Sequence, residues 1–252
     1  MLTIAVILAG GSGTRAGAGL PKQFRILPDG RTVFETCVAA FEACDCIDEV
    51  AVVMPEAHMD TARLIAVACG WRKVRLFIAG GRERWESSWR ALQEIRSAHP
   101  ETECNILLHD CARPFVSQAV LSRVCRALDE HEAVSVTVPV TDTVYTVSEG
   151  SVLCAIPPRP QLRRAQTPQA FRLSVVLDAY TQALAQASQL TATDDCGVVH
   201  DYRPDIPIYL VEGEEANRKL TYAEDFPAIP VPQQPPLPDA SPQDTRADRG
   251  NH

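Results

Sequence analysis

The chain has 252 residues, of which 46% are apolar and 22% charged, and its formal net charge is −8 at pH 7. This length suits one α/β domain with a large core, and the negative charge argues against a nucleic-acid-binding surface. The short N-terminal apolar segment has no basic residues before it, and no stretch reaches about 18 apolar residues, so neither export nor membrane insertion is expected. The sequence predicts a cytoplasmic protein without a nucleic-acid or membrane partner.

Strand-like apolar segments alternate with helix-like segments along most of the chain. The expected strands are residues 4–8, 50–54, 74–78, 105–109, 134–138 and 208–211, and the expected helices include residues 32–44, 59–69, 85–98 and 118–131. This alternation predicts a single α/β domain over residues 1–226, with a mostly parallel, Rossmann-like sheet and helices on both faces. Ligands of such sheets bind beyond the carboxyl ends of the strands, so residues that follow strand ends should share one rim.

The first strand leads into a glycine-rich turn that delivers Arg15 and Lys22. Closely spaced glycines let backbone N–H groups converge on an anion, which predicts a phosphate-binding turn. Two better-known motifs compete with this interpretation. Residues 11–16 fit the dinucleotide pattern G-x-G-x-x-[GA], but the next strand ends too far away to supply the expected acidic residue, and Pro21 before Lys22 excludes a Walker A motif. Taken alone, the turn could also be an ordinary strand-to-helix connection.

A second glycine pair, Gly80-Gly81, precedes a helix whose first turns carry Arg84 and Ser87. A helix N-terminus and its hydroxyls can bind a ribose or a base, although a serine here could equally cap the helix. The next strand ends at Asp110, a natural magnesium ligand beside phosphates, with a plain ion pair to Arg113 as the alternative.

Residues 142–156 predict a β-hairpin arm, because two apolar segments flank the sequence Ser-Glu-Gly-Ser at 148–151. Its apolar residues need covering, either by its own domain or by a second subunit, and the sequence leaves both open.

Residues 227–252 hold seven of the 19 prolines and are expected to be disordered. The Asp194-Asp195 pair suits a solvated turn or a helix N-cap. The nine cysteines, an odd number scattered through apolar segments, predict buried free thiols in place of a disulfide framework.

Seven blocks in order resemble the sugar-alcohol phosphate cytidylyltransferases. They are residues 8–15 with 21–23, Gly80-Gly81 with Glu83, Arg84 and Ser87, residues 109–114, Asp142-Thr143, Gln166 to Gln169, Thr193-Asp194, and Glu212-Gly213 with Asn217 and Lys219. The resemblance implies a nucleotidyltransferase or glycosyltransferase-A-like sheet and a Mg²⁺-dependent homodimer joined through the arm. The implied reaction transfers CMP from CTP to a polyol phosphate with release of pyrophosphate. The implied acceptor is methylerythritol 4-phosphate, for isoprenoid precursors by the non-mevalonate route, and the alternative is ribitol 5-phosphate, for surface polymers.

The resemblance also implies a role for individual residues. The expected catalytic cations are Arg15, Lys22 and Lys219. The residues expected around CTP are Ala9, Gly10, Gly11, Gly13, Gly80, Gly81, Arg84, Ser87, Asp110 and Cys111, with Asp110 also at the metal. The residues expected around the polyol phosphate are Arg113, Thr143, Arg159, Thr167 and Thr193.

Three features depart from the family pattern: Arg218 at an apolar position, Cys111 at a small-residue position, and the proline-rich tail. A non-catalytic nucleotide-binding module is the alternative from another class. It predicts the loss of Arg15, Lys22, Asp110 or Lys219, and all four are present.

Overall fold

A computed structural model describes residues 1–10, 21–148, 151–186, 190 and 192–226. Gly11, Gly13, Arg15 and the proline-rich tail at 227–252 therefore lie outside the described residues. The central sheet has seven strands in the order β3-β2-β1-β4-β8-β5-β9. Their bounds are β1 Leu2–Leu8, β2 Glu49–Met54, β3 Val74–Ala79, β4 Cys104–Asp110, β5 Ala133–Pro139, β8 Arg163–Arg172 and β9 Ile208–Glu212.

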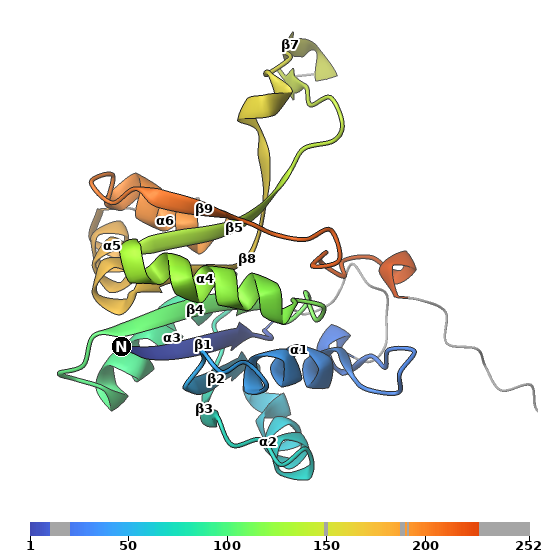
Figure 1. Cartoon of the computed structure of the whole chain (residues 1–252), viewed down its shortest axis with the longest axis vertical. Coiled ribbons are helices and arrows are strands. Elements are labelled where there is room, and N and C mark those ends of the chain that lie inside the picture. Colours follow the sequence, from blue (N-terminus) through green and yellow to red (C-terminus); the bar gives the residue numbers. More distant parts are fainter. Residues whose placement is uncertain (11–20, 149–150, 187–189, 191, 227–252) are drawn as a thin grey trace, which may run out of the picture.

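Helices cover both faces of this sheet, as the sequence predicts (Figure 1). Their bounds are α1 Val33–Glu42, α2 Met59–Ala68, α3 Arg84–Ala98, α4 Gln118–Glu130, α5 Leu173–Gln186 and α6 Asp195–Tyr202. Helices α1, α2 and α4 contribute to the core on one face, and α3, α5 and α6 to the core on the other. Short 3₁₀ turns lie at Lys22–Phe24, Glu56–His58, Arg159–Gln161 and Ala223–Asp225.

The central strands are buried on both faces because their side chains alternate between two apolar layers. In β1, Ala5 and Ile7 pack with α1 and α4, whereas Ile4 and Val6 pack with α3 and α5. A parallel strand with a helix layer on each side needs such a continuous apolar run. Strands β1, β2, β3 and β4 run parallel, so their carboxyl ends meet at one edge.

Strand β8 is the element that the sequence analysis missed. It runs antiparallel to both neighbours, β4 and β5, and it contains Pro168, which is atypical of a central strand. The peptide bond between Thr167 and Pro168 is cis. Because β8 inserts between β4 and β5, the sheet is mostly but not wholly parallel. Helices α5 and α6 follow it and pack against each other and the sheet.

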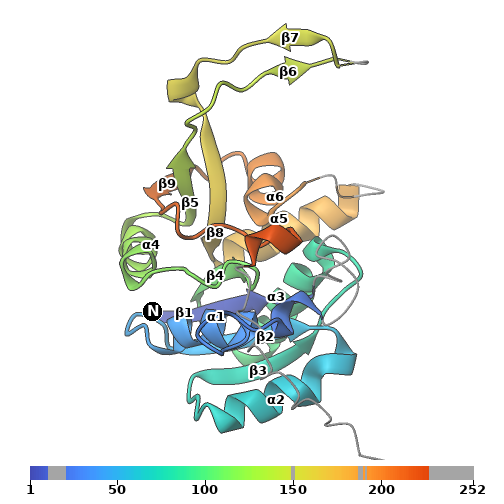
Figure 2. The same ribbon diagram turned by 90° about the vertical axis from the view of Figure 1, so that its right-hand side faces the viewer.

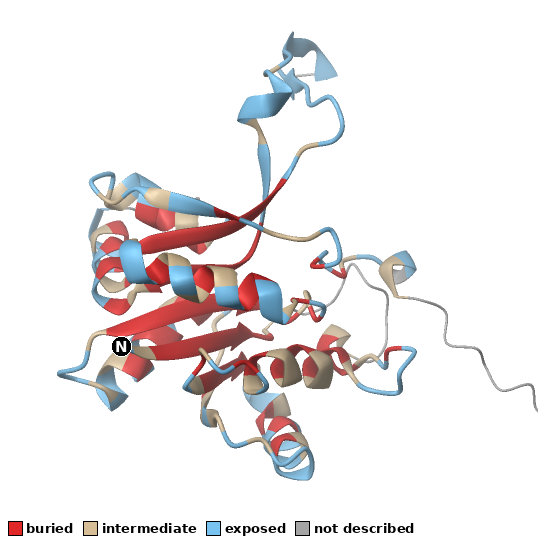
Figure 3. Ribbon diagram, in the orientation of Figure 1, coloured by how far each residue is buried: buried red, intermediate tan, exposed pale blue. Residues whose placement is uncertain are grey.

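The predicted arm is present and projects from the sheet (Figure 2). It pairs β6 (Thr146–Val147) with β7 (Leu153–Ala155) in antiparallel orientation. Its large apolar side chains are exposed, Val147 to 63% and Val152 to 62%, and Figure 3 shows the arm almost entirely in the exposed colour. The arm therefore does not fold back onto its own domain.

The prediction of free thiols is wrong for one pair of cysteines. Cys46 and Cys125 form a disulfide, while the other seven cysteines are free. Spacing along the chain could not reveal this pair, because the fold brings together residues 79 positions apart. Among the described residues, no helix has the length and apolar character needed to cross a membrane.

Candidate active site

A cavity of about 500 Å³ lies at the carboxyl edge of the parallel strands. The residues expected around CTP and the reacting phosphate line much of it. The expected residues in its wall are Ala9, Gly10, Lys22, Gly81, Arg84, Ser87, Asp110, Cys111, Thr193 and Lys219. Segments that lie far apart in the sequence therefore meet at the rim that the strand pattern predicts.

Two connections after strand ends form one wall of the cavity. After β1, the Ala9 N–H donates to the Val53 carbonyl at 2.7 Å, and after β3, the Gly81 N–H donates to the Ser87 hydroxyl at 3.0 Å. Gly81 must be a glycine, because an added Cβ would lie 2.2 Å from the Glu86 Cβ. Ser87 lies within α3 and is not its N-cap. Its hydroxyl accepts from Gly81 and so connects the turn after β3 to the helix.

Asp110 lies between two cations at the end of β4. Its Oδ1 accepts from Arg84 Nε at 3.1 Å and its Oδ2 accepts from Lys219 Nζ at 2.7 Å. The simple Asp110–Arg113 pair is not what forms, since Arg113 donates to the Asn217 carbonyl at 2.9 Å. Burial alone would raise the pKa of Asp110, but the charges of Arg84 and Lys219 hold it well below its usual range. The carboxylate is therefore ionised at neutral pH.

A buried carboxylate behind the cavity wall holds Arg84. Asp195 is fully buried, its Oδ2 lies 2.7 Å from Arg84 Nη1, and its Oδ1 accepts from the Tyr180 hydroxyl at 2.7 Å. Burial would lower the pKa of Arg84, yet Asp195 and Asp110 raise it above its ordinary value. Nothing in the sequence around Asp195 indicates this role. Only its neighbour Asp194 is the N-cap of α6, accepting from the Gly197 N–H at 2.8 Å.

Thr167, expected at the polyol phosphate, instead braces Asp110 from within the core. Its hydroxyl accepts from the Asp110 N–H at 3.1 Å and lies 3.1 Å from His109 Nδ1. The other ring nitrogen of His109 lies 3.0 Å from the Arg113 carbonyl. This chain fits a neutral imidazole that donates from Nε2 and accepts at Nδ1. Burial is the main cause that lowers the pKa of His109 to about 4.

The depressed pKa of His109 predicts a loss of stability in mild acid. The unfolded chain binds a proton near pH 6.5 and the folded chain only near pH 4, so stability is full above pH 6.5 and falls as the pH drops toward 4. We expect this single group to lower the free energy of unfolding by about 2 kcal/mol between pH 7 and pH 5. The measurement is urea denaturation at both pH values.

The matched variants for this prediction are His109→Gln and His200→Gln. His109→Gln should remove most of the difference between pH 7 and pH 5. His200 has a side chain that is 80% exposed, so His200→Gln should leave the difference unchanged. Equal pH dependence in the wild type and His109→Gln would contradict the assignment. Asp110 does not interfere, because its lowered pKa acts only below about pH 4.

The segment after β9 closes the cavity and brings Lys219 to it. The Asn217 side chain, fully buried, donates to the Thr167 carbonyl at 2.8 Å, and the Leu220 N–H donates to the Ala112 carbonyl at 2.8 Å. Lys22 then donates to the Leu220 carbonyl at 2.8 Å. Lys22 therefore contacts the same segment that carries Lys219. Arg218 is exposed, so this departure from the family pattern leaves the packing of its neighbours intact.

The remaining residues expected at the polyol phosphate do not all reach this cavity. Thr193 lines it. Thr143 is an exposed residue of the arm, and Arg159 is an exposed residue at the base of the arm, where its Nη2 donates to the Thr143 hydroxyl at 3.3 Å. Arg113 is half-buried beneath the cavity and bonds to backbone carbonyls. Within one chain, the arm residues are therefore separated from Thr193 and the lysines.

A magnesium ion at this site would depend on the nucleotide. Within the residues that the structure describes, there is no group of three or more His, Cys, Asp or Glu side chains that could hold a metal. Magnesium beside phosphates commonly takes only one or two carboxylates and fills its other positions with phosphate oxygens and water. The ionised Asp110 in the cavity wall fits that requirement.

Comparison with known proteins identifies the family. Residues 3–229 match the 2-C-methyl-D-erythritol 4-phosphate cytidylyltransferase family. The enzyme of that name from Thermobifida fusca is 44% identical over 226 residues, which cover 88% of this chain and 89% of the relative. The Bifidobacterium longum enzyme is 38% identical and the match covers 89% of this chain and 77% of the relative.

Solved structures agree with the sequence relatives. The 4-diphosphocytidyl-2C-methyl-D-erythritol synthase of Anaerococcus prevotii superposes with a TM-score of 0.76 at 26% identity, covering 89% of this chain and 92% of that one. The 2-C-methyl-D-erythritol 4-phosphate cytidylyltransferase of Thermus thermophilus gives a TM-score of 0.67 at 30% identity, covering 87% and 93%. The chain belongs to the 2-C-methyl-D-erythritol 4-phosphate cytidylyltransferase family and is a cytidylyltransferase.

Proposed function

We propose that the protein transfers CMP from CTP to 2-C-methyl-D-erythritol 4-phosphate, releasing pyrophosphate, in the synthesis of isoprenoid precursors. The observation that carries the proposal is the cavity in which Arg84 and Lys219 pair with the buried carboxylate of Asp110 and Lys22 adds a third cation to the wall. The names of the relatives favour this acceptor over ribitol 5-phosphate. The cytoplasm, where CTP is made, is the proposed compartment.

The proposed chemistry needs positioning and positive charge rather than a protein nucleophile. A phosphate oxygen of the acceptor attacks the α-phosphorus of CTP, the bond to the β-phosphate oxygen breaks, and pyrophosphate leaves. Lys22 and Lys219 would stabilise the negative charge that builds up on the transferring and leaving phosphates. The Leu220 carbonyl holds the Lys22 ammonium group in place, and Asp110 holds that of Lys219 in the cavity wall until the phosphates bind.

Asp110 is the proposed contact to Mg²⁺. A bound Mg²⁺ would neutralise part of the triphosphate charge. When the phosphates enter, they offer Lys219 and Arg84 an alternative anion, which would release the Asp110 oxygens that these cations now occupy. Gly10, Gly81 and Ser87 also line the cavity and would face the nucleoside, and Thr193 would face the acceptor.

The proposed enzyme is a homodimer in which the arm serves the neighbouring subunit. Thr143 and Arg159 do not reach the cavity of their own chain, and the arm exposes Tyr145 to 58% and Leu153 to 50%. An apolar hairpin standing in solvent favours a protein contact. A second copy would cover the arm. The Arg159 guanidinium of the first copy would then lie near Thr193 of the second copy, where an acceptor phosphate needs a cation.

Mixing two defective variants tests whether the arm acts on its partner. Lys22→Ala damages the cavity and Arg159→Ala damages the arm, so each homodimer should turn over slowly. A hybrid dimer would contain one site with both residues intact. Because random mixing makes half of the dimers hybrid, co-refolded protein should recover roughly a quarter of wild-type turnover. Activity no higher than the mean of the two variants would refute the exchange.

The activity itself is tested by pyrophosphate release from CTP and Mg²⁺. Methylerythritol 4-phosphate and ribitol 5-phosphate are supplied separately, and ATP replaces CTP as a control. We expect turnover with CTP and the first acceptor only. Turnover with ribitol 5-phosphate alone would assign the protein to surface-polymer synthesis, and turnover with neither would refute the proposed reaction.

A further inference from the structure

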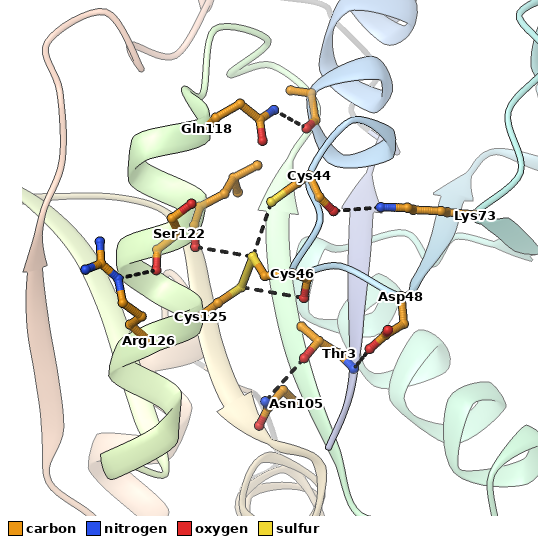
Figure 4. Close-up of a disulfide and its surroundings, with 12 residues drawn as sticks. Thr3, Cys44, Cys46, Asp48, Lys73, Asn105, Gln118, Ser122, Cys125 and Arg126 are labelled. Atoms are coloured by element: carbon orange, nitrogen blue, oxygen red, sulfur yellow. Dashed lines mark hydrogen bonds between the residues drawn. A yellow bond between two sulfur atoms is a disulfide. The ribbon is translucent and has the colours of Figure 1, made fainter.

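Three cysteine sulfurs meet in one cluster (Figure 4). The cluster lies beside the first residues of β1 and β4, at the edge of the sheet opposite the cavity described above. Cys44 and Cys46 lie in the connection between α1 and β2, and Cys125 lies on α4. Cys46 and Cys125 are joined, with their Cα atoms 6.5 Å apart, and the Cys44 Sγ lies 3.2 Å from the Cys46 Sγ. The proposed transfer reaction uses none of these residues. A cluster of three sulfurs from two separate segments therefore has no role in it.

The surroundings of the pair suit the reduced state as well as the oxidised one. The Leu121 carbonyl oxygen lies 3.9 Å from the Cys46 Sγ, and the Cys46 carbonyl oxygen lies 3.8 Å from the Cys125 Sγ. If the disulfide is reduced, each new thiol therefore has a backbone carbonyl close by to which it can donate. The site can therefore change its redox state while the fold around it stays in place.

Solvent molecules can reach the Cys46–Cys125 bond through a second cavity, separate from the one at the proposed active site. The space has a volume of about 460 Å³, and both Cys46 and Cys125 are in its wall. Arg126 and Arg172 also line it, opposed by the single carboxylate of Asp129, so the wall has an excess of positive charge. Such a wall favours small solutes that carry carboxylates. Cys44 is buried on the inner side and does not line this cavity.

We propose that Cys46 and Cys125 form a reversible thiol–disulfide exchange site for small thiols and disulfides that carry carboxylates. In oxidation, the thiolate of one cysteine attacks a small disulfide, forms a mixed disulfide and displaces one small thiolate. The other cysteine then attacks the protein sulfur of the mixed disulfide and displaces the second small thiolate. Two electrons pass to the small disulfide, and the two protons from the protein thiols go to the two released thiols. Reduction runs the same steps in reverse.

Cys44 is the internal thiol next to this site. An attack of its sulfur on Cys46 would release Cys125 and move the bond. Burial raises the pKa of the Cys44 thiol, so it stays protonated and reacts slowly, because only the thiolate is nucleophilic. The Cys46–Cys125 bond is therefore the product that should accumulate, with Cys44 left as a thiol.

Oxidation should act on the stability of the protein rather than on its turnover. The bond links α4 to the α1–β2 connection across 79 residues, and closing a long loop restricts the unfolded chain. Strands β1 and β4 begin beside this site, where Thr3 and Asn105 near their first residues line the cavity, and they reach the proposed active site only at their other ends. We expect oxidation to raise the melting temperature by about 5–10 °C and to leave kcat within twofold of the reduced protein.

The experiment equilibrates the full-length protein with glutathione and glutathione disulfide at several ratios, followed by alkylation and peptide mass spectrometry. We expect a Cys46–Cys125 crosslink whose amount follows the ratio in both directions, together with the rise in melting temperature. Cys125→Ser should abolish the rise, whereas Cys69→Ser and Cys154→Ser, which replace exposed free cysteines, should leave it unchanged. A bond that native protein neither forms nor loses at any ratio would overturn the proposal.

A second comparison tests the cavity as the route of entry. Glutathione disulfide carries carboxylates, whereas hydroxyethyl disulfide is neutral. Arg126→Ala should slow oxidation by glutathione disulfide by about two- to fivefold, the scale of one exposed charge, and should not slow oxidation by the neutral reagent. Equal effects on both reagents would overturn the proposed preference for carboxylates. The stability of Arg126→Ala, measured in the reduced state, shows that the variant is folded.

Discussion

Replacement of Lys22 by alanine should lower kcat by about two to three orders of magnitude, the scale seen when one preorganised transition-state donor is lost. The chain contains only three lysines, and two of them, Lys22 and Lys219, line the cavity. The ammonium group of Lys22 is held 2.8 Å from the Leu220 carbonyl, in the wall of the cavity that would receive the phosphates. A steady-state assay of pyrophosphate release measures the effect.

The third lysine supplies a matched control for this variant. Lys73 donates to the Cys44 carbonyl at 2.6 Å, away from the cavity, so Lys73→Ala should keep turnover within a few-fold of wild type. Because Lys22 also contacts the closing segment, Lys22→Met, which keeps the length of the side chain, separates the loss of charge from the loss of packing. Turnover within tenfold of wild type in both Lys22 variants would disprove the assigned role.

Replacement of Asp195 by alanine should lower the free energy of unfolding by about 3–5 kcal/mol. The variant leaves the buried Tyr180 hydroxyl without its acceptor and leaves Arg84 with one carboxylate partner in place of two. Removing one partner of a buried pair leaves the other partner buried without compensation for its lost hydration. The loss of stability is therefore larger than for a pair on the surface. Urea denaturation measures it.

Asp201→Ala is the control, because Asp201 lies on the same helix, α6, with a side chain that is 55% exposed. Its effect should stay within about 0.5 kcal/mol. Asp195→Asn should fall between the two, since the amide oxygen can still accept from Tyr180. A loss below 1 kcal/mol in Asp195→Ala would show that water replaces the carboxylate and that the buried network contributes little.

The sequence predicts the parallel part of the sheet well, because its inner strands β1, β2 and β4 contain the apolar runs that burial on two faces requires. It fails at β8, where Pro168 interrupts the strand pattern and where antiparallel pairing depends on partners far along the chain. The hairpin arm was predictable from its turn. The exposure of the arm's apolar residues in one chain was not predictable, because a periodic pattern gives no information about which surface covers these residues.

Within the site, residues that follow strand ends were placed by topology alone, as Gly81 and Asp110 show. The role of Thr167 was not, since a hydroxyl in a strand can face a ligand or the core, and here it binds the Asp110 N–H and His109. Asp195 was missed for a related reason. An acidic pair next to a helix start usually lies in solvent, and only the neighbouring arginine and tyrosine make a buried one stable.

The contact between Lys22 and Leu220 joins residues 198 positions apart, and it orders events during protein synthesis. A nascent chain can pair β1 with β4 and form most of the sheet before residues 213–221 leave the ribosome. At that stage it has no Lys219 at Asp110 and no carbonyl for Lys22. The site is therefore completed by residues 213–221, and a chain truncated before them would keep Gly81, Lys22 and Arg84 in the cavity wall but would lack Lys219.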